Sequence, residues 1–163
     1  MVTRYLIIFC TLIACCGCST PPPITHLDVT IRDKTFKLEI AKDLIARRDG
    51  LMHREAINKN EGMIFIFPDA QERSFWMKNC LIPIDIIFLD SRGTVTAVHA
   101  MLSEPPKTNN ESDFVYEQRL SHYWSYGPAR FAIEFSAGTI QELELRVNDH
   151  VDLDLQELKR IAR

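Results

Sequence analysis

Apolar and polar residues alternate in several segments of the chain, a spacing that predicts half-buried strands. The alternation is clearest at 27–31 and 36–40, which the turn residues between them join into a hairpin. Further strands are expected in the apolar or alternating segments 63–68, 74–79, 82–90, 94–102, 129–138 and 150–155. These patterns predict one small domain of the α+β class, mainly β, with about seven mostly antiparallel strands curled into a barrel-like sheet.

Helical spacing replaces the alternation in two or three short segments. Residues 42–52 predict a helix with Asp43 as a candidate N-cap and Gly50 as its stop. Residues 139–145 predict a second helix, and the tail 156–163 is either a frayed amphipathic helix or disordered. The folded domain is therefore expected to span residues 26–155.

The first eighteen residues have the composition of a signal peptide rather than of a fold. Arg4 precedes a ten-residue apolar run, and small residues and cysteines follow. As a helix, ten residues would rise about 15 Å, half of the roughly 30 Å hydrocarbon core of a bilayer. Residues 1–18 therefore predict export, and the proline-rich residues 19–25 predict a stiff tether.

Two cysteines of this segment are candidates for lipid attachment. The sequence Leu12–Cys15 resembles the bacterial lipobox, and Cys18, followed by Ser, Thr and prolines, is the rival position. Acylation of Cys15 or Cys18 would hold the domain on a bacterial membrane, facing the periplasm or the exterior. The plainer alternative is a cleaved secretory signal.

The composition argues against a disulfide framework and against nucleic acid as a partner. Only Cys80 lies in the body of the chain, so no disulfide framework is expected. The formal net charge is −3 and no basic cluster is present, which disfavours nucleic acid as a partner.

The stretch "SFWMKNC" places large apolar side chains beside a cation and an amide. Read as a strand, it would turn Phe75, Met77 and Asn79 to one side. In a structural interpretation the first two are core, the stem of Lys78 lies across the ring of Trp76, and Asn79 bonds the backbone where the chain changes direction.

In a functional interpretation the same stretch forms the floor of a pocket. Trp76 would stack on a ligand, while Lys78, Asn79 and Asp85 would bind its charged or hydroxyl groups, which suits a sugar or a polar peptide. Arg48, Arg54 and Arg130 are further candidate cations, and Glu134 is a candidate acid. Alternatively, Arg130 could form a buried ion pair with Asp85 or Glu134.

Two other classes of function depend on different residues. Asp85 and Glu134 could serve as the acid and base of a glycan-directed hydrolase or lyase. The methionines, with Cys80 and nearby histidines, are soft ligands of the kind that Cu(I) prefers. Because no nucleophile elbow, Walker loop or zinc motif is present, a binding role is favoured over catalysis, and no cofactor or metal is expected.

Four segments resemble the DUF192 (UPF0127) family: "RRDGLMHRE" (47–55), "EGMIFIFP" (61–68), "FWMKNCLIPIDIIFLDSRG" (75–93) and "GPARFAIEFSAG" (127–138). The resemblance implies a small, mostly β domain that is often exported or lipid-anchored, and it implies no activity. Cys80 replaces the usual Thr, His53 a common aromatic residue, and Glu144 a frequent Gly, while Asn148 can still adopt a left-handed turn.

Residues 104–123 depart further from the family pattern. They are polar and show no regular spacing of apolar residues. They predict a surface loop that is longer than in the family pattern. Taken together, the sequence predicts a membrane-anchored binding or accessory module of the cell envelope. Its ligand would be a polar or anionic small molecule, a glycan or a peptide.

Overall fold

The computed structural model describes residues 25–162. The predicted signal peptide, both candidate acylation cysteines and nearly all of the predicted tether lie outside these residues. Within them, no helix is long and apolar enough to cross a membrane.

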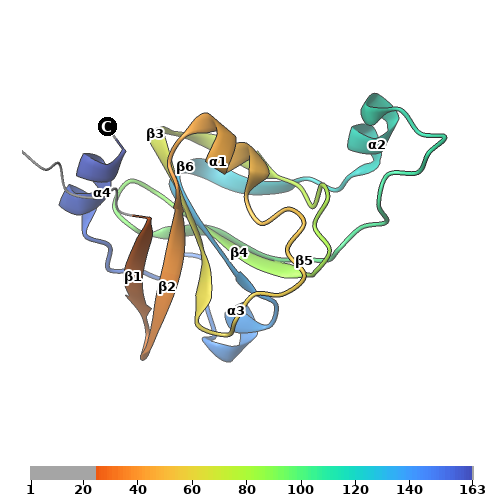
Figure 1. Cartoon of the computed structure of the whole chain (residues 1–163). Coiled ribbons are helices and arrows are strands. Elements are labelled where there is room, and N and C mark those ends of the chain that lie inside the picture. The colour runs from red at the N-terminus through yellow and green to blue at the C-terminus, as the bar shows by residue number, and fades with distance from the viewer. Residues whose placement is uncertain (1–24, 163) are drawn as a thin grey trace, which may run out of the picture.

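One mixed sheet forms the centre of the molecule (Figure 1). Its six strands follow the order β1-β2-β3-β6-β4-β5, and every neighbouring pair is antiparallel except the parallel pair β2–β3. The strands are β1 (His26–Ile31), β2 (Lys34–Ala41), β3 (Glu61–Phe75), β4 (Ile84–Leu89), β5 (Val95–Met101) and β6 (Tyr123–Ser136). The prediction of a mainly β domain is confirmed. The sheet is open rather than barrel-like, and it has one strand fewer than expected.

The missing strand is the predicted segment 150–155. It contributes only an isolated bridge between Thr94 and His150. The segment cannot extend further as a strand, because Asp154 already accepts hydrogen bonds from the amides of Gln156 and Glu157 and so begins a helix.

The helices are short: α1 (Leu44–Asp49), α2 (Asp113–Arg119), α3 (Thr139–Glu142) and α4 (Leu155–Ile161). Asp43 accepts a hydrogen bond from the amide of Ala46, and Gly50 ends α1 with a positive φ of 48°, as the sequence predicted. The predicted left-handed turn at Asn148 is also present, with φ 74°. Glu144 also adopts a positive φ, of 49°.

One observed helix was only one of two alternatives in the sequence analysis, and another was not predicted. The tail forms α4, whose Leu158 and Ile161 are buried in the core. Residues 104–123, predicted to be a loop, contain α2, which projects from the body of the molecule (Figure 1). Tyr116 is the one buried residue of α2, so the helix has no apolar face that a periodic pattern could reveal.

The strand predicted at 74–79 is wrong beyond Phe75. β3 instead runs through Pro68 without a break, and its pairing with β6 shifts register between Ile66 and Gln71 and again between Glu72 and Ser74. Such shifts bend a strand and change the direction of its side chains. Residues 76–80 then form a turn in which Asn79 adopts a positive φ of 54°.

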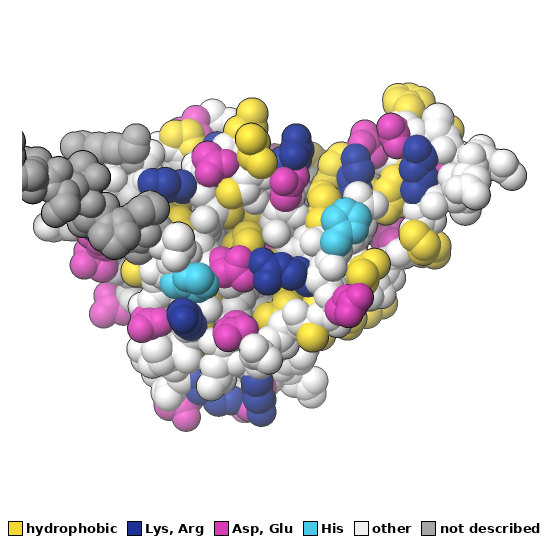
Figure 2. Space-filling model, in the orientation of Figure 1, with side chains coloured by type: hydrophobic (Ala, Val, Ile, Leu, Met, Phe, Trp, Pro, Cys, Tyr) yellow, Lys and Arg dark blue, Asp and Glu magenta, His cyan; other side chains and the backbone are white. Residues whose placement is uncertain are grey.

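The sheet is buried on both faces. We call them the α4 face and the α1 face after the helices that cover them. The α4 face carries the cluster that includes Phe36, Ile64, Ile66, Ile87, Ile133, Phe135 and Leu158. The α1 face carries the cluster that includes Met63, Phe65, Phe67, Met77, Ile86, Phe88 and Ala132. On the surface shown in Figure 2, basic and acidic side chains are interspersed.

Candidate functional site

A cavity of about 420 Å³ opens on the α1 face. This volume falls within the range of small-molecule sites. The cavity is enclosed by α1 and the residues after it, by the second half of β3, by the turn 76–80 and by β6. Its lining consists of segments 47–52 and 72–76, together with Phe65, Phe67, Cys80 and Glu134.

Glu134 is the deepest charged group of this cavity. It lies on β6 opposite Met63 of β3 and Ile86 of β4, and only 5% of the residue is exposed. Its Oε2 atom is buried and has no hydrogen-bond partner in the described part of the chain. Burial raises the pKa of this carboxyl to about 8, so it is mostly protonated at neutral pH.

Gly50 lies beside the buried carboxyl of Glu134 at the cavity. A Cβ atom at Gly50 would lie 3.3 Å from the ring of Phe65 and 3.9 Å from Glu134 Oε2. The positive φ of Gly50 would also strain any other residue. The helix stop of α1 therefore also keeps the cavity open above the acid.

Two arginines flank the ring of Phe67 at the cavity wall. The guanidinium carbon of Arg73 lies 4.3 Å from the ring centroid, and that of Arg47 lies 5.5 Å from it. Arg73 is held by the carboxylate of Asp69, and Arg47 donates to the carbonyl of Ile66 at 3.0 Å. Both cations are therefore fixed in place, and Arg73 Nε is buried without a partner.

Aromatic rings form the remaining wall. Phe75 makes edge contacts with Phe65, at a centroid distance of 4.8 Å, and with Phe88, at 5.3 Å. Trp76 separates the cavity from a shallower groove that Ser74, His122 and Trp124 complete. The cavity thus combines an apolar wall with one buried acid and fixed cations.

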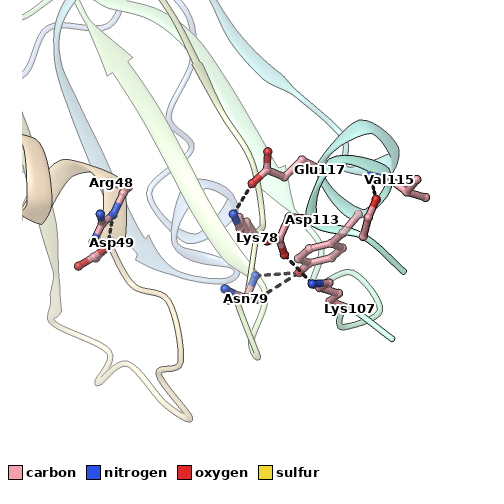
Figure 3. A network of polar contacts seen from close by, with 10 residues as sticks. Arg48, Asp49, Lys78, Asn79, Lys107, Asp113, Val115 and Glu117 are labelled. Atoms are coloured by element: carbon pink, nitrogen blue, oxygen red, sulfur yellow. Dashed lines mark hydrogen bonds and ion pairs between the residues drawn. The ribbon is translucent and has the colours of Figure 1, made fainter. Parts of the chain in front are cut away.

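Lys78 and Asn79 do not line the cavity; they hold α2 (Figure 3). Lys78 forms an ion pair with Glu117, and its ammonium lies 5.5 Å from the ring of Trp76. The backbone N–H group of Asn79 donates a hydrogen bond to the hydroxyl of Tyr116 at 3.0 Å. The cation–π contact of the structural interpretation is therefore present.

Asp85 lies on the opposite face of the sheet from Glu134. It pairs with Phe135 across β4 and β6, whereas Glu134 is the next residue along β6 and so points to the other side. Asp85 Oδ2 accepts from the amide of Ile140 at 2.8 Å, at the start of α3. Burial raises the pKa of Asp85, and hydrogen bonds from the α3 amides oppose the rise. The predicted acid–base pair is not assembled.

Two of the other predicted cations lie elsewhere. Arg54 forms an ion pair with Glu39 at 2.7 Å. Arg130 forms neither of the predicted ion pairs, with Asp85 or with Glu134. Of the eight residues predicted for the site, Arg48, Trp76 and Glu134 line the cavity, and Arg48 pairs there with Asp49.

Cys80 also lines the cavity, although the sequence indicated only a small core residue. Burial raises the pKa of its thiol to about 12, so the thiol stays protonated and unreactive. Met63, Met77 and Met101 are buried in the apolar cluster of the α1 face. Within residues 25–162 no group of three or more His, Cys, Asp or Glu side chains could hold a metal ion.

Sequence reasoning missed both wall arginines. Arg47 could have been found, because it is the first residue of the motif "RRDG" and precedes the helix stop. Arg73 gave no such signal, because "DAQER" has the composition of an ordinary loop. Its position depends on the irregular pairing of β3 with β6.

The fold and the cavity define a small mixed-sheet α+β domain with a ligand-sized site on one face. The model of the DUF192 family, described as "Uncharacterized ACR", matches residues 27–153, and the chain belongs to this family. A comparison with curated proteins finds no match.

Two solved structures share the fold. A Sinorhizobium meliloti 1021 protein, described as a proposed transcription regulator, is 25% identical with a TM-score of 0.62; the alignment covers 80% of this chain and 97% of that one. A Novosphingobium aromaticivorans DSM 12444 protein of unknown function is 24% identical with a TM-score of 0.63, covering 83% and 94%.

Proposed function

We propose that this protein is a membrane-tethered binding module of the cell envelope that holds a small polar ligand in the cavity on the α1 face. The observation that carries the proposal is Glu134, a buried acid that lines the cavity and whose Oε2 atom has no hydrogen-bond partner among residues 25–162. Leaving a buried polar group unpaired costs about 1–3 kcal/mol. A ligand that supplies the missing partner recovers that free energy on binding.

The walls of the cavity support a ligand with both polar and apolar parts. The rings of Phe65, Phe67 and Phe75 offer apolar contact area. The guanidiniums of Arg47 and Arg73 are held by Phe67 and by backbone or carboxylate oxygens, so little side-chain entropy remains to be lost when a ligand binds.

Other functions have weaker support. A glycan hydrolase built on Asp85 and Glu134 would need both carboxyls on one side of the sheet. Cu(I) binding would have to recruit methionines that are packed in the core. Transcription regulation, suggested by the description of one solved structure that shares the fold, is disfavoured by the net charge of −3, and the face drawn in Figure 2 carries interspersed acidic and basic side chains.

Binding can be tested by screening the purified full chain against a library of small polar metabolites by thermal shift. Compounds that stabilise the wild type should lose at least tenfold in affinity in Glu134→Gln. Glu61→Gln, a change of an exposed acid at the start of β3, is the matched control. If every compound that binds the wild type binds Glu134→Gln equally well, the cavity is not the site.

The tether is tested separately. The apolar run and the cysteines of residues 1–18 support acylation, so replacing both Cys15 and Cys18 by Ser should move the protein from the membrane fraction to the soluble fraction. The single replacements identify the acylated residue. Unchanged membrane attachment of the double variant would count against the anchor.

A further inference from the structure

The cavity contains two unsatisfied polar atoms of opposite kind. Within residues 25–162, the buried side-chain nitrogen and oxygen atoms that lack a hydrogen-bond partner are Arg73 Nε and Glu134 Oε2. The first is a donor and the second is an acceptor when the carboxyl is ionised, and both residues line the same cavity. A chain that buries one acid and one base in a single cavity could have paired them with each other.

Arg73 is held by contacts with residues other than Glu134. Its Nη2 atom binds the carboxylate of Asp69 and, at 3.0 Å, the carbonyl of the same residue. Its guanidinium lies 4.3 Å from the centroid of the Phe67 ring. These contacts fix the planar group while its Nε hydrogen remains unused, so a ligand oxygen can accept it.

Glu134 is the buried acid of this cavity, and no cation of residues 25–162 neutralises it. Of the other acids in the lining, Asp49 pairs with Arg48 at 2.7 Å and Glu72 is exposed to solvent. A ligand ammonium would supply both the missing donor and the missing positive charge, which a neutral hydroxyl would not.

We infer that the ligand is a zwitterion of the amino-acid type, with its ammonium at Glu134, its carboxylate at Arg73 and an apolar side chain against the phenylalanine wall. This inference rests on the proposed binding function of the cavity. Arg73 would bind the carboxylate end of the ligand, and Glu134 would bind its ammonium end. The rings of Phe65, Phe67 and Phe75 would contact the apolar side chain of the ligand.

Such a ligand would change the protonation of the site. Without a ligand, burial holds the pKa of Glu134 at about 8, and an ammonium beside it would favour the ionised form. Binding at pH 7 should therefore release close to one proton, and affinity should rise toward tenfold per pH unit up to about pH 8. The other ionisable groups that line the cavity are Arg47, Arg48, Asp49, Glu72, Arg73 and Cys80.

The test is isothermal titration of the full chain with L-leucine, L-methionine and L-phenylalanine at pH 7. Two buffers of different ionisation enthalpy give the number of protons released. At least one amino acid should bind with release of about one proton. Its N-acetyl derivative lacks the ammonium and its amide lacks the carboxylate, so each should bind at least 30-fold more weakly.

Variants assign the two ends. Glu134→Gln should abolish the proton release and weaken binding of the amino acid at least 30-fold. Arg73→Lys keeps the charge but not the Nε donor, and it should weaken the amino acid while leaving the weaker amide unaffected. Arg92→Lys, on the exposed turn after β4, and Glu61→Gln are the matched controls and should bind as the wild type does.

The outcomes separate this inference from the function on which it rests. If metabolites bind through Glu134 but free amino acids do not, the binding function stands and the zwitterion is wrong. Binding of amino acids without proton release, or with equal affinity for their N-acetyl forms, also overturns the zwitterion. If no compound binds and Glu134→Gln changes nothing, both proposals fail. The wild-type titrations decide even if a variant does not fold.

Discussion

Asp85 and Glu134 are two buried acids on neighbouring strands, and their surroundings differ completely. Their exposed fractions are 2% and 5%, and their side chains point to opposite faces of one sheet. Asp85 accepts hydrogen bonds from the amides that begin α3, whereas Glu134 Oε2 accepts none. Burial of an acid therefore does not by itself indicate a site. Our proposal depends instead on the missing partner of Glu134 Oε2 within residues 25–162.

The helices that cover the two faces explain the difference. On the α4 face, Leu158 and Ile161 insert into the core and fill the space above the sheet. On the other face, α1 buries none of its own residues. Only the small side chain of Ala46 packs from α1 against the cluster of this face, and a cavity that Glu134 lines remains beside it.

The largest expected effect is the pH dependence of stability caused by Glu134. Its pKa is about 8 in the folded state and near 4.5 in the unfolded chain, so the folded state binds the proton more tightly. This contribution is complete below pH 4.5 and is lost as pH rises to about 8, at most about 5 kcal/mol in all. Urea unfolding between pH 5 and 8.5 measures it.

Glu134→Gln should remove most of this slope, because an amide does not titrate. The raised pKa of Asp85 gives a slope of the same sign, which remains in the variant. The surface acids with lowered pKa, such as Glu142 and Glu157, lose their contributions only at lower pH. A wild-type stability that is constant from pH 5 to 8.5 would contradict the environment assigned to Glu134.

The next largest effect concerns the satisfied acid. Asp85→Ala removes the acceptor for the amide of Ile140 and leaves a small void, so the free energy of unfolding should fall by about 2–3 kcal/mol. Glu134→Gln at pH 8 should be neutral or stabilising, because it removes an unpaired buried charge. An equal decrease in the free energy of unfolding in both variants would contradict the difference that we describe between the two acids.

Gly50→Ala tests the opening above Glu134. The positive φ of Gly50 and a Cβ atom 3.3 Å from the Phe65 ring should cost about 1–2 kcal/mol. The methyl group would also lie over Oε2 and narrow the cavity, so ligand affinity should fall as well. Gly138→Ala shares a positive φ but has open space around its Cβ position, and it is the matched control. If Gly50→Ala binds ligand with the same affinity as Gly138→Ala, the cavity is not the ligand-binding site.

The smallest expected effect concerns the attachment of α2. The ion pair of Lys78 with Glu117 is partly exposed, so Lys78→Ala should lower stability by less than about 1 kcal/mol. The change should nevertheless speed hydrogen exchange within Asp113–Arg119, because the helix keeps few other contacts with the body. Unchanged exchange would mean that Tyr116 alone holds α2.

Local sequence patterns predicted those parts of the fold that depend on neighbouring residues. The alternation in 27–31 and 36–40, the cap at Asp43 and the stop at Gly50 are all present. The parallel pairing of β2 with β3 was not predictable in this way, because it depends on contacts between distant segments. The same holds for the continuation of β3 through Pro68.

The candidate site was only partly predictable for a related reason. Trp76 and Glu134 were identified because a ring and an acid stood out within apolar segments. Lys78 and Asn79 stood out equally, yet they serve to attach α2. Sequence alone cannot distinguish these uses, because the difference depends on which distant helix packs against the turn 76–80.

The position of Trp76 has a practical consequence. The chain contains two tryptophans, and the other, Trp124, belongs to the same groove beside the cavity wall. Ultraviolet-excited emission of the unlabelled protein therefore originates almost entirely from this corner of the molecule. The intrinsic tryptophan fluorescence of the unlabelled protein should therefore change when a compound binds in the cavity.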